Sequence, residues 1–390
     1  MKTVLYLPLF YLGIYLAMPL LGYLYWGDAV FSAYKVDNSN IMLMLASFFT
    51  CFYFFLISFF GLLIKPIYLG FLGFIYNLSV ISICVASYFF LALIFYGEYG
   101  STFRHHGGGM LDGGALVFSL YILKVYCFFA IFVLRMYKKM ISRFLILVIG
   151  ISGLFSFMTS LDIIHVVVCF FLFIKPEFEE TSGKNSITVI IKLLSVGILV
   201  LLGGMVSKKG FDISSYLDVI DNLLMFFISR FSVHILSLAN IMNDLGFWIT
   251  QSLDASVFEL ERLVYRLQSL LGFAQTPLEP ANLARINAIE IFYDPRDITG
   301  ASPGPAAAAL LGQPFIFGFI FRVFIDGLCL AYIRNIVKDF DAGLIVFSFF
   351  PTFLSLIATN FLFINPLQPG AVIFAFLFIS GSKIEQLRRL

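Results

Sequence analysis

The chain has 390 residues, of which 61% are apolar and only 12% are charged. A soluble domain carries roughly 25% charged residues. Phenylalanine alone occurs 49 times, and the mean hydropathy is +0.98. This composition leaves too little polar surface for a water-soluble globule of this size. It excludes a soluble enzyme, a nucleic-acid-binding protein and a disordered hub as descriptions of the whole chain.

Apolar segments long enough to cross a bilayer as helices recur along the sequence, which predicts an all-α polytopic membrane protein. The first candidate is too long for the apolar core of a secretory signal and lacks a small-residue cleavage pattern, so we expect a retained anchor. The candidate spans are 3–25, 41–64, 72–96, 115–134, 187–206, 315–337, 343–364 and a shorter 370–380.

A further apolar segment, 144–174, is too long for one ordinary span and short for two. Two tilted helices there give about ten spans and place both termini inside, whereas a single helix gives nine. Short cytoplasmic loops collect Lys and Arg, which favours ten, because only Lys35 and Arg104 then lie in short outer loops. The cations on the inner side are Lys2, Lys65, Arg135, Lys138, Lys139, Arg143, Lys175, Lys184, Arg334, Lys338, Lys383, Arg388 and Arg389.

This topology divides the chain into three parts. Residues 1–206 hold about seven spans, 207–314 form a large extracytoplasmic loop, and 315–390 hold about three spans. A loop of that length in a compact protein is usually functional. Within it, we expect a helical stretch at 213–246 that lies outside, half-buried at the membrane interface, because its polar residues make insertion costly.

The rest of the large loop carries two further patterns. Ser256 and Glu259 have the spacing of a capping box, and an apolar stripe follows as far as Leu271. This predicts a helix that packs on its neighbours or lies on the bilayer surface. Residues 293–305 form a polar, Pro- and Gly-punctuated loop of the kind that lines sites, although its charged residues are equally compatible with solvated turns.

Another outer loop, 97–114, is rich in glycine and carries Arg104, His105 and His106. Glycine lets the backbone approach a ligand closely, and the run places a fixed cation beside two titratable bases. A flexible hairpin is the alternative. We expect no metal site, since adjacent histidines do not point the same way on regular structure. The sequence also lacks nucleotide-binding motifs, and its five cysteines, all within spans, predict no disulfide framework.

Ionisable residues within spans are costly and often functional. Lys124 needs a partner, for which Asp162 and Asp326 are the obvious anions. Arg322 and Asp326 are four residues apart on one expected helix, so they can also pair with each other.

Three segments, together with the large late outer loop, resemble the Wzy-type O-antigen polymerases. They read FRHHGGGMLDGGALVFSLYILKVY, ISRFSVHILSL and TGASPGPAAAALLGQPFIFGFIF. The resemblance implies a GT-C-like glycosyltransferase of the bacterial inner membrane with its large loop in the periplasm. It further implies an undecaprenyl-pyrophosphate-linked glycan as donor, a second lipid-linked unit as acceptor, and a chain-length regulator protein as a further partner. Family members often carry an Arg where this chain reads MTSLDIIHV.

Such chemistry needs cations on the leaving pyrophosphate and a base for the acceptor hydroxyl. Arg230 and Arg104 are the first candidates for the clamp, with Arg322 and Arg296 behind them. His234, one turn from Arg230, is the candidate base. The remaining candidates are Asp294 as an alternative base and His105 and His106 as substrate-binding residues. Because the donor is already activated, arginines can replace a metal, so no metal or other cofactor is expected.

Two other functions remain open. An O-antigen ligase, which transfers glycan to the lipid A core, has the same outer-loop plan, and the sequence does not separate it from a polymerase. A lipid-linked glycan flippase or other secondary transporter would show a repeat between its halves and short loops. The sequence shows no such repeat, and its large outer loop, 207–314, is longer than a carrier needs.

Overall fold

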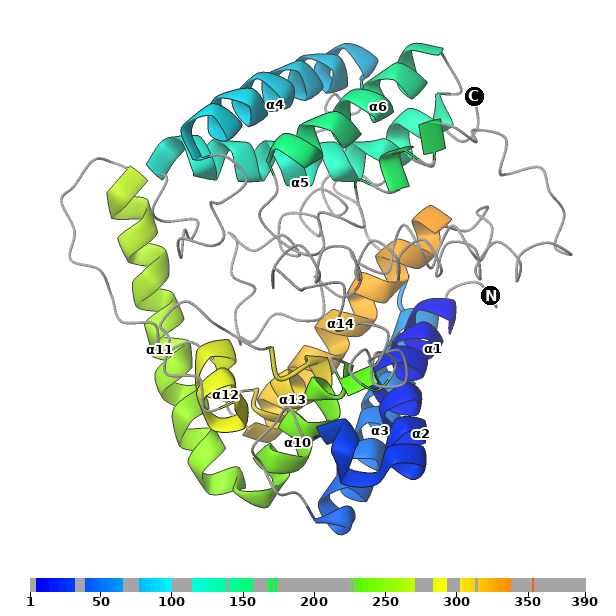
Figure 1. The fold of residues 1–390 in the computed structure, drawn as a ribbon, viewed down its shortest axis with the longest axis vertical. Helices are drawn as coiled ribbons and strands as arrows, with labels where there is room; N and C mark the ends of the chain where they lie inside the picture. Colours follow the sequence, from blue (N-terminus) through cyan, green and yellow to red (C-terminus); the bar gives the residue numbers. More distant parts are fainter. Residues whose placement is uncertain are drawn as a thin grey trace, which may run out of the picture.

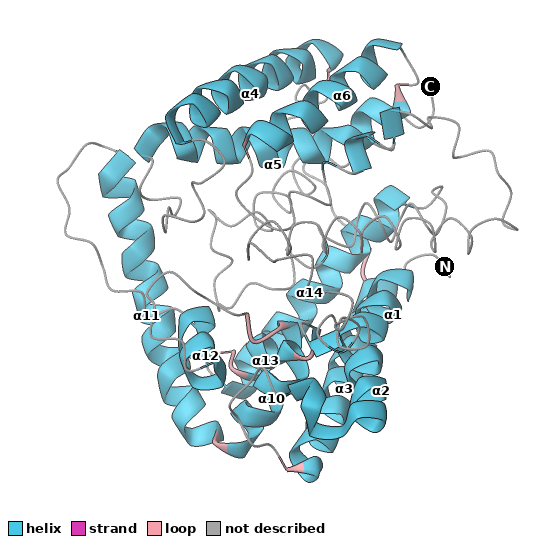
Figure 2. Cartoon of the chain, viewed as in Figure 1, coloured by secondary structure: helices cyan, strands magenta, loops and turns pink. Residues whose placement is uncertain are grey.

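In the computed structural model, the described residues form helices and turns without a β-strand (Figure 2). This confirms the all-α prediction for those residues. They are 5–31, 39–65, 77–99, 114–137, 140–156, 231–270, 283–292, 302–312 and 315–337, with the shorter pieces 166, 168–170, 172–173, 225, 228–229 and 353.

The first span runs from Tyr6 to Trp26 as three joined pieces: α1 (Tyr6–Leu12), the π-helical turn η2 (Gly13–Ala17) and α2 (Met18–Trp26). Pro19 explains the π turn. It has no N–H to donate to the preceding turn and its ring crowds that turn, and a π turn re-satisfies the freed backbone groups. The helix ends at Gly27, whose φ of 59° favours glycine, and the short helix η3 (Gly27–Phe31) follows.

Three helices among the described residues are long and apolar enough to cross a membrane: Tyr6–Trp26, α3 (Asn40–Leu63) and α4 (Leu78–Tyr99). They correspond to the first three predicted spans, although α4 begins later than 72. Ser39 caps α3, since its Oγ accepts a hydrogen bond from the Met42 N–H at 3.3 Å. Exposed Met44, Phe48 and Phe55 line the outside of α3, as expected for a lipid-facing surface.

Two other predicted spans are helices with nearly the predicted ends, α5 (Gly114–Met136) and α14 (Phe315–Val337). The predicted spans at 187–206 and 370–380 lie outside the described residues, as does 343–364 except for Phe353.

The helices form two groups (Figure 1). In the first, α4, α5 and α6 (Met140–Phe155) pack against one another. In the second, α3 packs against the first span, α10 (Val233–Asn243), α13 (Pro305–Leu310) and α14. The long helix α11 (Leu245–Leu270) starts beside α10 and reaches α5, so it connects the two groups.

The ambiguous segment 144–174 folds back on itself. A Cβ on Gly150 would lie 2.9 Å from the Cβ of Cys169, and one on Gly153 would lie 2.6 Å from a methyl group of Val166. A single straight helix rises 1.5 Å per residue, so it would hold each of these pairs roughly 20–30 Å apart. The described residues before 157 and after 165 therefore pack against each other, which excludes one long helix through 144–174, and glycines permit this close packing.

Helices α3 and α14 run parallel. Phe49 contacts Phe319 near their starts, whereas near their ends Arg334 donates hydrogen bonds to the Leu62 and Ile64 carbonyls at 2.6 and 3.0 Å. Between these points, a Cβ on Gly327 would lie 2.5 Å from the Cβ of Phe60, so the absence of a side chain sets the helix spacing. The predicted topology requires this parallel packing, because both spans would run from the outer to the cytoplasmic side.

Among the described helices of the large loop, α10 and α13 pack against candidate spans, α11 reaches α5, and α12 (Leu283–Phe292) packs on α10 and α11. Helix α10, the described part of the expected helical stretch 213–246 together with the short pieces before it, lies along α3 and beside the π turn. Helix α12 attaches to α10 through a 3.0 Å hydrogen bond from the Asn287 amide to the Ser237 hydroxyl, both buried.

The predicted capping box at Ser256 and Glu259 is wrong. Helix α11 is continuous through both residues and begins at Leu245. The signal at its start is Asp244, which separates it from α10 and whose carboxylate accepts a hydrogen bond from the Phe247 N–H at 3.2 Å. Two residues at capping-box spacing do not end a helix whose interior residues favour its continuation.

Candidate functional site

His234 is at the centre of a cluster drawn from distant parts of the chain. It lies in the first turn of α10, and its Nδ1 is 2.6 Å from the Tyr11 hydroxyl of α1. Tyr15, which the π turn presents, stacks on the imidazole with ring centroids 4.3 Å apart. We call His234, Tyr11, Tyr15 and Gly304 the histidine cluster.

Gly304 closes another side of the ring. Its φ of 91° and ψ of 164° are restricted almost entirely to glycine, and a Cβ there would lie 2.8 Å from the His234 Cγ. Pro305 follows at the first position of α13, where its missing N–H costs no helical hydrogen bond. The Gly-Pro pair therefore turns the backbone against the imidazole and starts a helix at the same point.

The environment of His234 keeps its ring neutral. Although His234 keeps part of its surface exposed, the groups packed around the ring remove most of its water, and this burial lowers the pKa of the imidazole from its ordinary value of 6.5 to about 3, because the charged form loses more hydration than the neutral form. A neutral imidazole has one N–H donor and one acceptor nitrogen. The ring can therefore donate one hydrogen bond and accept another at physiological pH.

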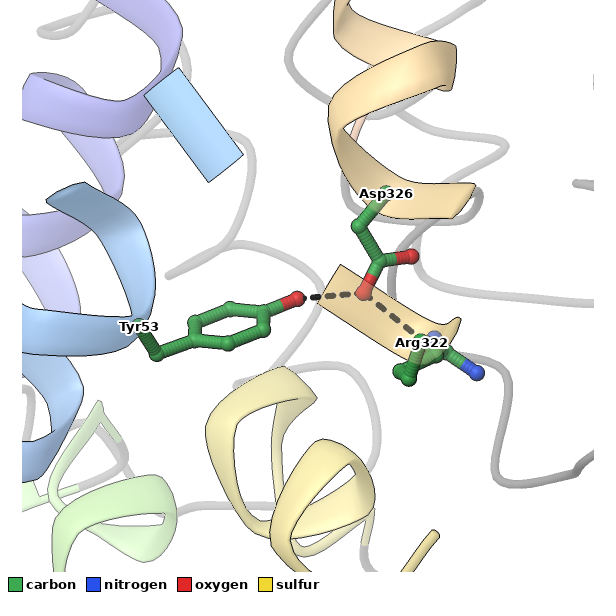
Figure 3. A network of polar contacts seen from close by, with 3 residues as sticks. All are labelled: Tyr53, Arg322 and Asp326. Carbon is green, nitrogen blue, oxygen red and sulfur yellow. Dashed lines mark hydrogen bonds and ion pairs between the residues drawn. The ribbon is translucent and has the colours of Figure 1, made fainter. Parts of the chain in front are cut away.

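A second buried cluster joins α3 to α14. The Arg322 Nε donates to Asp326 Oδ2 at 2.8 Å, and the Tyr53 hydroxyl donates to the same oxygen at 2.6 Å (Figure 3). Arg322 is 6% exposed and Asp326 is 0% exposed, so each charge depends on the other for compensation. We call these three residues the ion-pair cluster. The predicted pairing of Arg322 with Asp326 is confirmed.

The two clusters are neighbours. Phe54, which follows Tyr53 on α3, packs against the Tyr11 ring with centroids 4.4 Å apart. The clusters thus bring together residues of the first span, α3, α10, α14 and the turn before α13. A continuous polar and aromatic region runs through the second helix group.

Of the residues predicted from the sequence, the structure describes His234 and Arg322. His234 belongs to the histidine cluster and Arg322 to the ion-pair cluster, so they do not share one set of contacts. The others lie outside the described residues: Arg230, Asp294, Arg104, His105, His106 and Arg296. Next to Arg230 in the sequence, Ser229 is buried and Phe231 packs edge-on against Tyr15 at 5.5 Å.

Sequence reasoning did not single out Tyr11, Tyr15 or Tyr53. A signal for the first two exists, because Pro19 in an apolar span predicts a local irregularity, and π turns occur often at functional sites. Tyr15 lies within the π turn η2, and Tyr11 lies one helical turn before Tyr15. Nothing in the local sequence connects Tyr53 with an aspartate on another helix.

Lys124 belongs to the other helix group. It is buried on α5 and donates a 2.5 Å hydrogen bond to the Ser156 carbonyl at the end of α6. Tyr88 of α4 lies 2.8 Å from the Ser156 hydroxyl, so this group ties the three helices together. Of the two anions proposed for Lys124, Asp326 instead binds Arg322 and Tyr53, and Asp162 lies outside the described residues.

Within the described part of the chain, no three His, Cys, Asp or Glu side chains are grouped so that they could hold a metal ion. All five cysteines are free thiols. Comparisons with protein-family models, with curated proteins and with solved structures find no match to this chain.

Proposed function

We propose that the protein is a GT-C-like O-antigen polymerase of the bacterial inner membrane. It joins oligosaccharide repeat units carried on undecaprenyl pyrophosphate, with the large loop in the periplasm. In the reaction, an acceptor hydroxyl of one unit displaces the lipid pyrophosphate from the anomeric carbon of another. The proposal rests on the sequence resemblance and on the site described above.

One observation carries most of the support. Two of the segments that resemble the polymerases, 228–238 and 299–321, are far apart in the sequence, yet Gly304 of one lies against His234 of the other. The ring between them is neutral, partly accessible and held on two sides by tyrosines. A polar side chain held in this way inside an apolar bundle is typical of a site rather than of packing alone.

The proposed roles follow from charge and contacts. In this proposal Arg230 neutralises the pyrophosphate. It is the sequence neighbour of Phe231, which packs on Tyr15 of the histidine cluster. Arg322 already binds a carboxylate, which suits it to a structural role better than to a substrate clamp. Arg104, Arg296, His105 and His106 remain candidates for glycan and phosphate contacts from the outer loops.

Reconstitution tests this proposal. Purified protein in liposomes with lipid-linked repeat units and EDTA should produce a ladder of extended glycans. Arg230→Ala should slow extension roughly a hundredfold, because one lost charge-assisted contact to a developing negative charge costs several kcal/mol. Arg143→Ala is the matched control, since Arg143 is exposed and lies on the predicted cytoplasmic side.

The other outcomes point to other functions. Transfer of glycan to lipid A core without extension would identify a ligase. Movement of lipid-linked glycan across the vesicle membrane without a ladder would identify a transporter. Normal ladders from well-folded Arg230→Ala protein would remove Arg230 from the site.

A further inference from the structure

The Tyr11 hydroxyl has one hydrogen-bond partner among the described residues, His234 Nδ1 at 2.6 Å. Tyr11 is 1% exposed, so a hydroxyl hydrogen that did not point at this nitrogen would be buried without an acceptor. Such a loss costs about 1–3 kcal/mol. The hydroxyl therefore donates, and His234 Nδ1 accepts.

The position of the ring proton follows. A neutral imidazole carries one proton, and when Nδ1 is the acceptor the proton is on Nε2. Burial favours the neutral ring by lowering its pKa. His234 thus has an N–H at Nε2 and no second acceptor nitrogen.

The Nε2 edge remains open to a ligand. Tyr15 stacks on the ring, and Gly304 fits against its Cγ–Cδ2 side. His234 itself is partly exposed, and Nε2 makes no hydrogen bond to the described residues. A fully enclosed nitrogen would then be a buried polar atom without a partner, as Asp326 Oδ1 is among the described residues, and Nε2 is not such an atom. The N–H therefore faces accessible space.

We infer that Tyr11 is a positioning residue that fixes His234 as the Nε2–H tautomer, and that His234 donates a neutral hydrogen bond to an anionic phosphate oxygen of the substrate. This rests on the proposed polymerase function and replaces the base role predicted from the sequence. A fixed N–H that stabilises developing negative charge needs no proton transfer of its own.

The reaction balances without proton transfer at His234. The bond between the anomeric carbon and the pyrophosphate oxygen breaks, and its electron pair leaves with the lipid pyrophosphate. The acceptor hydroxyl oxygen forms the new bond to the anomeric carbon. Its proton passes to a carboxylate, for which Asp294 is the candidate from the sequence. His234 keeps its proton throughout.

The tautomer can be tested without any activity. In protein labelled with ¹⁵N-histidine in nanodiscs, His234→Gln identifies the His234 signals among those of the four histidines. We expect a bare Nδ1 and a protonated Nε2 at neutral pH. Tyr11→Phe should produce a mixture of tautomers, whereas Tyr25→Phe, which changes an exposed tyrosine of the same span, should not. A proton on Nδ1 in the unmodified protein would overturn the assignment.

Substitution by glutamine separates a donor from a base. The Gln amide can donate from a position near that of Nε2 but cannot accept a proton at neutral pH. If His234 is a donor, His234→Gln should keep at least about a tenth of the extension rate, while His234→Ala should lose roughly a hundredfold. Equal inactivity of the two variants would restore the base role.

Binding of phosphate gives an independent readout. Added inorganic pyrophosphate should shift the Nε2–H signal of His234, and Tyr11→Phe should weaken that shift. No shift at saturating pyrophosphate would contradict the anionic ligand. If the unmodified protein makes no ladder but the tautomer and the shift are as expected, the proposed polymerase function fails while the donor assignment stands.

Discussion

The ion-pair cluster and the histidine cluster lie beside each other, yet they are built in opposite ways. In the first, Arg322 and Asp326 carry compensating charges, and Tyr53 adds a second donor to the same carboxylate oxygen. In the second, burial favours the neutral form of His234, which keeps part of its surface exposed. A compensated pair links two helices, whereas a neutral ring with an open edge is available to a ligand. This difference supports a structural role for the ion-pair cluster and the proposed ligand contact for the histidine cluster.

The largest effect should come from breaking the ion-pair cluster. Asp326→Ala removes the carboxylate that compensates the buried Arg322, which should lower the free energy of unfolding by about 3–5 kcal/mol. Thermal unfolding in detergent would measure it. The double variant Arg322→Met with Asp326→Leu removes both charges and should recover much of the loss. Unchanged stability of Asp326→Ala would show that the pair does not hold α3 and α14 together.

A smaller effect is expected at Gly304. Gly304→Ala adds backbone strain of about 1–3 kcal/mol and pushes a methyl group into the His234 ring, so extension activity should also fall. Gly27→Ala is the matched control, because Gly27 also has a positive φ, of 59°, but a Cβ there meets nothing within 4 Å. Thermal unfolding and ladder formation should therefore diverge between the two variants. Equal losses of activity would contradict the contact between Gly304 and the ring.

The effect that is smallest at neutral pH is the pH dependence of stability from His234, because it grows only on acidification. Because the folded pKa is depressed from 6.5 to about 3, the unfolded chain binds more protons between these values. This contribution to stability is present above pH 6.5 and is lost as the pH falls toward 3. His234→Gln lacks it, so the stability difference between the unmodified protein and this variant should shift in favour of the variant on acidification. Parallel unfolding curves from pH 7 to pH 4 would show that His234 titrates normally.

The sequence predicted the helical elements well where a local property decides them. The apolar lengths of 41–64 and 315–337 gave helices with almost the observed ends, α3 and α14. The pairing of Arg322 with Asp326 also followed from a spacing of four residues on one helix. A local pattern gave a wrong helix start at Ser256, where capping-box spacing occurs inside the continuous helix α11.

The packing of residues 150–153 against 166–169 shows why other features could not be predicted. The sequence left one helix or two open, because apolar length and central polar residues fit both. Packing excludes the single helix. The side chain of Cys169 lies close to Gly150, and that of Val166 lies close to Gly153. A small residue permits such contact but does not specify its partner.

The sequence by itself therefore determined the helical class of the described residues, in which three helices are long and apolar enough to cross a membrane, and identified His234 as a candidate. Only the tertiary structure decided what His234 meets. Its partner Tyr11 is 223 positions away, and Gly304 approaches from a third segment. Apolar length and helix spacing are properties of neighbouring residues, and so they can be read along the chain. The partner of a buried nitrogen depends on how distant helices pack, and no local pattern encodes that.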